Sequence, residues 1–149
     1  MEESMQQVFG LILGIVNDEK LGLSKKIDAV VKRYIDSLLE NPNLPLFVLS
    51  EIQANPQRLM KKIGITDLLV ANNNFYRQMQ EQIDIKGIKG ITPLHIFINI
   101  VSMTVFPIVG RPLLVSIHAP MTDEDYMIFL DERRKLVPMW IKTMLKLDE

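Results

Sequence analysis

Hydrophobic residues recur at helical spacing along most of the chain. In residues 2–17, "EESMQQVFGLILGIVN", they lie three or four positions apart and form a single stripe. Residues 24–41 repeat this pattern with charged residues on the opposite side, and Ser24 is a candidate cap for that helix. Alternating segments joined by hairpin turns, the signature of paired strands, do not stand out. The pattern therefore predicts helices.

Two short helices should follow, because prolines and asparagines divide the next segment. We expect them over residues 45–54 and 56–63, each with a proline in its first turn, where a missing amide hydrogen matters least. Asn55 is a natural cap for the second of them, and Gly64 is a natural end.

A loose turn near residues 71–73 should lead into a helix over residues 74–85. Thr92 is then a candidate cap for a helix that begins at Pro93.

The last helix has the clearest start signal. Thr122 and Asp125 have the spacing of a capping box, in which each side chain bonds to the other residue's backbone. Pro138 lies inside the same helix and should kink or break it. Together the patterns predict an all-α bundle of about seven helices in one domain, residues 1–149.

The stretch "PLHIFINIVSMTVFPIVGRPLLVSI", residues 93–117, is the most apolar part of the chain. Residues 94–110 carry no charge and reach the lower limit of about 17 residues for a membrane helix. Polar residues dilute it, however, and Pro107, Arg111 and Pro112 interrupt it. A single weak span among amphipathic helices favours a helix buried in protein, with membrane insertion as the less favoured alternative.

A helix that is apolar nearly all round must be covered on nearly all sides. The last helix carries Trp140 among aliphatic residues, which resembles an association surface. Periodicity alone leaves two alternatives open: a symmetric dimer through the last two helices, or the core of a monomer. The residues expected at a dimer interface are Phe106, Arg111, Leu114, Leu130, Val137, Trp140, Ile141 and Met144.

Three segments resemble the C-terminal domain of TetR-type transcriptional regulators, in the broad AcrR-like branch common in bacteria. They are "KRYIDSLLENPNLPLFVLSEIQANPQRL", "VFPIVGRPLL" and "FLDERRKLV", in this order and spacing. The resemblance implies an all-helical homodimer, joined by its last two long helices, with a small-molecule pocket in each subunit. It also implies that DNA binding belongs to a helix-turn-helix head, which these residues do not include.

A pocket for a small apolar or amphipathic ligand is the functional hypothesis that follows. Pockets in helical bundles are mostly apolar with a few polar groups, although the same side chains equally suit an ordinary core. Asn99 and Tyr34 are the sharpest candidates, because a buried amide or phenol needs a partner that a ligand could supply. The full set of candidates is Phe9, Tyr34, Phe47, Phe75, Met79, Phe97, Asn99 and Met103.

Catalytic and cofactor chemistry find little support in the sequence. Cysteine is absent, which excludes disulfides and thiolate sites and fits a cytoplasmic protein. No nucleophile elbow, glycine-rich phosphate loop or zinc-protease motif occurs, so we expect neither an enzyme nor a cofactor. His95 and His118 lack the neighbours of a metal pair, so no metal site is expected. The net charge of −1 does not favour nucleic acid binding by this chain alone.

Gly10 and Gly14 stand out in the first helix, because each glycine there lowers helix stability by about 0.5–1 kcal/mol relative to alanine. We expect a neighbouring element to pack closely against them; bending of the helix is the alternative.

Overall fold

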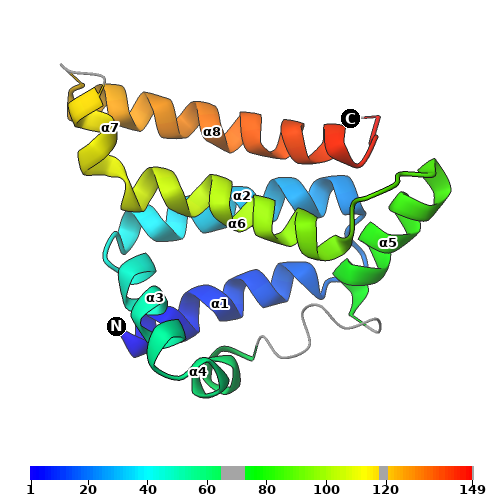
Figure 1. Ribbon diagram of the computed structural model, residues 1–149, viewed down its shortest axis with the longest axis horizontal. Coiled ribbons are helices and arrows are strands. Elements are labelled where there is room, and N and C mark those ends of the chain that lie inside the picture. The colour runs from blue at the N-terminus through cyan, green and yellow to red at the C-terminus, as the bar shows by residue number, and fades with distance from the viewer. Residues whose placement is uncertain (65–72, 118–120, 149) are drawn as a thin grey trace.

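A computed structural model of the chain describes residues 1–64, 73–117 and 121–148. These residues form eight α-helices and no strand, so the expected all-α bundle is confirmed (Figure 1). The helices are α1 (Glu2–Val16), α2 (Leu23–Glu40), α3 (Leu44–Ala54), α4 (Pro56–Ile63), α5 (Asn74–Lys86), α6 (Pro93–Val109), α7 (Arg111–Ile117) and α8 (Asp123–Met144).

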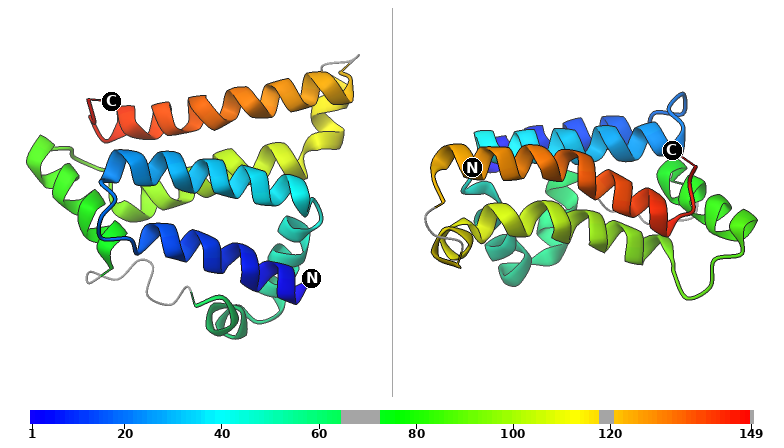
Figure 2. Two further views of the ribbon diagram at one scale, coloured as in Figure 1. Left: turned by 180° about the vertical axis from the view of Figure 1, so that it is seen from behind. Right: turned by 90° about the horizontal axis from the view of Figure 1, so that it is seen from above.

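Helix α2 is the centre of the bundle. It packs against α1, α6 and α8, and both ribbon views show these helices grouped along it (Figures 1 and 2). Its apolar stripe supplies the core, since Ile27, Val31 and Ile35 are all but inaccessible to solvent. Helices α3 and α4 lie at the end of the bundle where α1 begins, and α5 lies at the opposite end (Figure 1). The second predicted helix, whose pattern is amphipathic, is thus the central helix of the bundle.

Several helix ends form as expected. The Asn55 side chain accepts a hydrogen bond from the Arg58 amide at 3.0 Å, and Gly64 ends α4 with a left-handed φ of 67°. Thr122 and Asp125 form the reciprocal capping box at the start of α8, with bonds of 3.0 and 3.1 Å.

Ser24 does not cap α2, and this prediction was wrong. The helix begins at Leu23 after an extended Gly22, so Ser24 already lies within the first turn. Its hydroxyl is buried without a hydrogen-bond partner in the described residues. Of the turn expected near residues 71–73, only Asn73 lies within the described residues, where its side chain caps α5.

The apolar stretch 93–117 divides into two helices that meet at a bend of 69°. Pro107 has no amide hydrogen, so the Met103 carbonyl four residues earlier loses its usual helical donor. The Arg133 guanidinium on α8 replaces that donor, with bonds of 3.0 and 3.2 Å to this carbonyl. The Tyr126 hydroxyl donates to the Pro107 carbonyl at 2.8 Å and fixes the bend against α8. This division explains why there are eight helices and not about seven.

Pro138 does not break α8, which continues through it from Asp123 to Met144. The sequence predicted a kink or a break at Pro138, and the break does not occur.

Within the described residues, no individual helix is both long and apolar enough to span a membrane. The bent pair α6–α7 meets the length and composition requirements only when its two helices are taken together.

Gly10 and Gly14 lie on the exposed face of α1, and an added Cβ at either position would meet nothing within 4 Å among the described residues. The close packing expected there is therefore absent. Gly10→Ala and Gly14→Ala should each raise the free energy of unfolding by about 0.5–1 kcal/mol, because alanine restricts the unfolded chain and favours helix.

Urea unfolding measures this effect as a higher midpoint at an unchanged slope. Gly64→Ala is the matched control, and it should lower the midpoint because its φ of 67° disfavours a side chain. Unchanged or lower midpoints for the two α1 variants would contradict the open space observed around Gly10 and Gly14.

Candidate functional site: an apolar groove between α1 and α6

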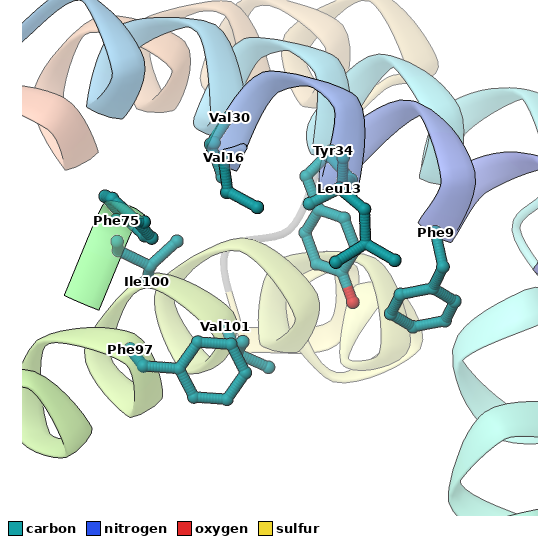
Figure 3. Close-up of a pocket in the computed structure, with 10 residues that line it drawn as sticks. Phe9, Leu13, Val16, Val30, Tyr34, Phe75, Phe97, Ile100 and Val101 are labelled. Atoms are coloured by element: carbon teal, nitrogen blue, oxygen red, sulfur yellow. The ribbon is translucent and has the colours of Figure 1, made fainter. Parts of the chain in front are cut away.

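Helices α1 and α6 each turn an apolar stripe toward the other across a groove. On α6 the stripe consists of Phe97, Val101 and Val105, which are four positions apart and therefore share one face. A cavity of about 50 Å³ opens between the two stripes (Figure 3). It is lined by Phe9, Ile12, Leu13, Val16, Val30, Tyr34, Phe75, Phe97, Ile100 and Val101.

A second cavity, of about 90 Å³, continues the groove toward α3. Phe9, Tyr34 and Val101 line both cavities, so the two form one elongated site with a shared middle. The other walls of the second cavity are Val8, Leu38, Leu44, Pro45, Val48, Leu49, Ile52 and Val105.

Tyr34 supplies the only polar side chain in the described walls of either cavity. Its hydroxyl makes no hydrogen bond to any described residue and points into the space between α1 and α6 (Figure 3). Burial among apolar side chains disfavours the phenolate and raises the pKa of Tyr34 to about 12. At neutral pH the site therefore holds one protonated phenol, which can donate a hydrogen bond.

Four of the eight expected pocket residues line the groove: Phe9, Tyr34, Phe75 and Phe97. The other four are not among the described lining residues. Met79 is fully buried in the core cluster that includes Ile27 and Ile35, and Phe47 is half-buried against a separate core cluster that includes Val8 and Leu44. Asn99 and Met103 lie on the side of α6 that faces α8, where the Asn99 amide contacts the Met144 sulfur at 3.3 Å.

Most of the aliphatic lining was not predicted from the sequence, including Leu13, Val16 and Val101. A helix as uniformly apolar as α6 gives no periodic contrast from which to tell its groove face from its α8 face. The four-residue repeat of Phe97, Val101 and Val105 was the available signal. It did not stand out, because apolar residues occur on every side of this helix.

The seam between α6 and α8 forms a second apolar feature. Large apolar side chains of α6 and α8 remain exposed, including Ile98 and Phe106 on α6 and Met139 and Trp140 on α8. Within the seam the Arg133 guanidinium donates to the Met103 carbonyl of α6 and lies 5.5 Å from the Trp140 ring and 5.7 Å from the Phe129 ring. Phe106 follows Met103 by about one helical turn, so we call Phe106 and Trp140 the α6–α8 face.

The expected interface residues fall into two groups. Leu130, Val137 and Ile141 are buried in the chain's own core, so in this arrangement they offer no surface to a second copy. Phe106 and Trp140 are exposed, and Met144 and Leu114 are half-buried. Arg111 forms an ion pair with Asp123 at 2.6 Å and stacks on Tyr126.

A buried lysine closes the α5 end of the groove. Lys26 is fully buried, and its amino group donates to the Val16 carbonyl at 2.9 Å and to the Asn74 side chain at 2.5 Å. Next to it, the Asn73 amide donates to the Asn17 side chain at 3.0 Å. These bonds join the last turn of α1 to the first turns of α2 and α5.

Among the residues that the structure describes, no group of three or more acidic or histidine side chains has the arrangement of a metal site. His95 is exposed on α6, and His118 lies outside the described residues.

The shifted pKa of Tyr34 predicts a change of stability at alkaline pH. The folded state holds the phenol proton up to a pH of about 12, whereas an unfolded tyrosine releases it near 10. Since the unfolded state then binds fewer protons, the free energy of unfolding should fall by roughly 2 kcal/mol between these values.

Urea unfolding at a series of pH values measures this fall. In Tyr34→Phe the free energy of unfolding should depend less steeply on pH over this range. Tyr126→Phe is the comparison, because burial also raises the pKa of that phenol. An identical pH profile for Tyr34→Phe and the unaltered chain would contradict the buried position of the hydroxyl.

Comparison of the chain with protein family models, curated proteins and solved structures gave no match.

Proposed function

We propose that this chain is the ligand-sensing and dimerisation domain of a TetR-type transcriptional regulator. The observation that supports this most is the apolar groove between α1 and α6, at whose middle the Tyr34 hydroxyl has no hydrogen-bond partner among the described residues. Its lining suits a small apolar or amphipathic ligand. In such a regulator a helix-turn-helix head would precede α1, and DNA would bind only through that head.

The ligand would act by shifting the population of two α1 positions. The two cavities, about 50 and 90 Å³, are small beside the roughly 300 Å³ at the lower end of ligand sites, so binding favours a wider groove. Helix α1 packs chiefly on α2, α3 and α4, and it borders the groove opposite α6. Moving α1 away from α6 is the direct way to widen it.

The polar contacts at the two ends of α1 differ. Its C-terminal end is bonded to the buried amino group of Lys26, whereas the N-terminal end, where Met5 and Val8 pack in the core, makes its ion pair with Lys62 in solvent, through Glu2 at 2.9 Å. Exposed ion pairs contribute about 0–1 kcal/mol. A ligand in the groove would therefore swing the N-terminal end, changing the spacing of two heads that must match half-sites about 34–36 Å apart.

A structural homodimer module without a ligand is the second candidate. The small volume of the two cavities and the exposed apolar side chains of the α6–α8 face support it. The two candidates differ in whether a neutral apolar probe enters the groove.

Nile red, an uncharged dye that fluoresces in apolar surroundings, separates the two candidates. It should bind the unaltered chain and lose its binding in Val101→Trp, which fills the shared middle of the groove. Circular dichroism and thermal unfolding establish that this variant folds, and Val101→Phe is the smaller alternative. Binding that is absent, or unaffected by both substitutions, would favour the structural module.

Spin labels test the coupling to α1. The sequence has no cysteine, so Glu3→Cys places one label per subunit at the exposed start of α1. The distance between the two labels of a dimer should change when Nile red binds, whereas labels at Glu132→Cys on α8 should keep theirs. An unchanged Glu3 distance would refute the coupling.

A further inference from the structure

We propose that the groove selects an uncharged, slender apolar molecule with one hydrogen-bond acceptor near its middle, and that the Tyr34 hydroxyl is the group that selects it. This inference deepens the ligand-binding function proposed above and rests on it.

The described walls of the groove carry no charge, which disfavours charged occupants. Apart from Tyr34, no ionisable side chain lines either cavity within the described residues. A carboxylate or ammonium group entering the groove would lose its water and gain no counter-charge. An uncharged molecule avoids this penalty and gains the contacts of an apolar lining.

The hydroxyl defines the polar group of the ligand. Because its pKa lies far above neutral, Tyr34 remains protonated and offers a hydrogen bond to the groove. The matching group is an acceptor such as a ketone, ester or ether oxygen. A pure hydrocarbon would shield the hydroxyl from water and leave it without a partner, which is unfavourable.

The place of Tyr34 defines where the acceptor lies. Its side chain belongs to the wall shared by both cavities, so apolar space extends from it toward α5 on one side and toward α3 on the other. Phe97 and Val105 mark eight residues of groove along α6, which corresponds to roughly 12 Å at 1.5 Å per residue. A chain with its acceptor near the middle fills both arms while its oxygen meets the phenol.

The narrowness of the cavities favours a flexible chain over a fused ring system. Neither cavity exceeds about 90 Å³, and aromatic side chains form much of the first one. A chain can lie along the groove with little displacement of these rings, whereas a broad ring system such as that of Nile red must part α1 from α6 to enter and should therefore bind more weakly than a fitting chain.

Three probes test the inference by calorimetric titration of the intact chain. Dipentyl ketone carries its oxygen at the centre, its isomer methyl nonyl ketone carries it near one end, and undecanoate is a charged analogue. Dipentyl ketone should bind most tightly. Tyr34→Phe should weaken its binding about fivefold to tenfold, which corresponds to one hydrogen bond, and should leave the isomer less affected.

The infrared carbonyl stretch gives a readout that a purely structural role of Tyr34 would not move. The stretch of bound dipentyl ketone should lie at a lower frequency than that of the free ketone in hydrocarbon solvent, and should return to that value in Tyr34→Phe. Tyr76→Phe is the matched control, since it removes the same hydroxyl from a residue outside both cavities. It should change neither the affinity nor the stretch.

The possible outcomes separate this inference from the proposed function. Equal affinities for the two isomers, tight binding of undecanoate, or unchanged ketone binding in Tyr34→Phe would overturn the inference. If Nile red still binds in a manner that depends on Val101, the ligand-binding function stands without it. If neither the ketones nor Nile red binds, both proposals fail.

Discussion

The double variant Phe106→Glu with Trp140→Glu is expected to sediment as a 17.2 kDa monomer under conditions in which the unaltered chain sediments as a dimer. In the single chain 56% of Phe106 and 38% of Trp140 is exposed, so neither side chain is essential to the core. In a dimer through the α6–α8 face each substitution would occur twice. A buried, unpaired carboxylate carries a penalty of several kcal/mol, so the dissociation constant should rise at least about 1,000-fold.

The chain offers a closely matched control for this prediction. Leu46 on α3 and Met60 on α4 are exposed to 56% and 39%, nearly the values of Phe106 and Trp140, and they lie away from the α6–α8 face. Leu46→Glu with Met60→Glu adds the same charge to the same extent of apolar surface, and it should remain dimeric. If the unaltered chain is monomeric at micromolar concentration, or if both double variants dissociate alike, dimerisation through this face is refuted.

Arg133 lies beside the α6–α8 face, but its positive charge does not oppose the burial of this face in a dimer. The guanidinium already donates to the Met103 carbonyl and lies against the Phe129 and Trp140 rings. A second copy that covered these rings would exclude water from a cation–π contact that exists in the single chain, which strengthens it. The cationic side chain would therefore need no new partner from the other subunit.

The boundaries of the helices could largely be read from local chemistry. Asn55, Gly64 and the Thr122–Asp125 pair end or begin helices through bonds made within a few residues, so their effect is visible in the sequence itself. The Ser24 prediction failed because Gly22, two residues earlier, offers a competing start to the same helix. The carbonyl that Pro107 leaves without a helical donor is satisfied by Arg133, 26 residues after the proline, which no local pattern reveals.

The faces of the helices were harder to predict than their ends. On α8 the regular stripe of Leu130, Val137 and Ile141 looked like an association surface, but the most regular stripe of a helix is the one its own fold buries. The exposed apolar residues, such as Trp140, lie beside that stripe. Similarly, Asn99 and Phe97 are neighbours in the sequence of α6 yet face different helices. Which side of an apolar helix meets which neighbour depends on long-range packing that no local pattern records.

Replacing Lys26 is expected to lower the free energy of unfolding more than any other substitution considered above. Lys26→Ala removes a fully buried side chain and leaves the Val16 carbonyl and the Asn74 side chain without their donor. The lost packing and the two unsatisfied acceptors together should destabilise the chain by about 3–5 kcal/mol. Chemical denaturation monitored by circular dichroism measures this change.

Lys26→Met separates packing from hydrogen bonding at the same position. Methionine keeps most of the buried volume and removes the charge, so this variant should lose only about 1–3 kcal/mol. Lys142→Met is the matched control. The Lys142 side chain is also largely buried, but its amino group is paired at 2.7 Å with the exposed carboxylate of Asp28, so its loss should cost only about 1 kcal/mol. If Lys26→Met is as stable as the unaltered chain, the bonds to α1 and α5 contribute nothing net.

The pH dependence of these variants identifies the charge state of the buried amino group. Burial lowers the pKa of Lys26 in the folded state, so folding releases a proton at alkaline pH. Because the unfolded chain then binds more protons, this residue should make the unaltered chain more stable as pH rises from the folded to the unfolded pKa of the amine. Lys26→Met should lose that rise. Through its bonds to Val16 and Asn74, Lys26 would keep the C-terminal end of α1 fixed while the N-terminal end moves. If Lys26→Met keeps the full ligand-dependent change in the Glu3 label distance, the pivot is elsewhere.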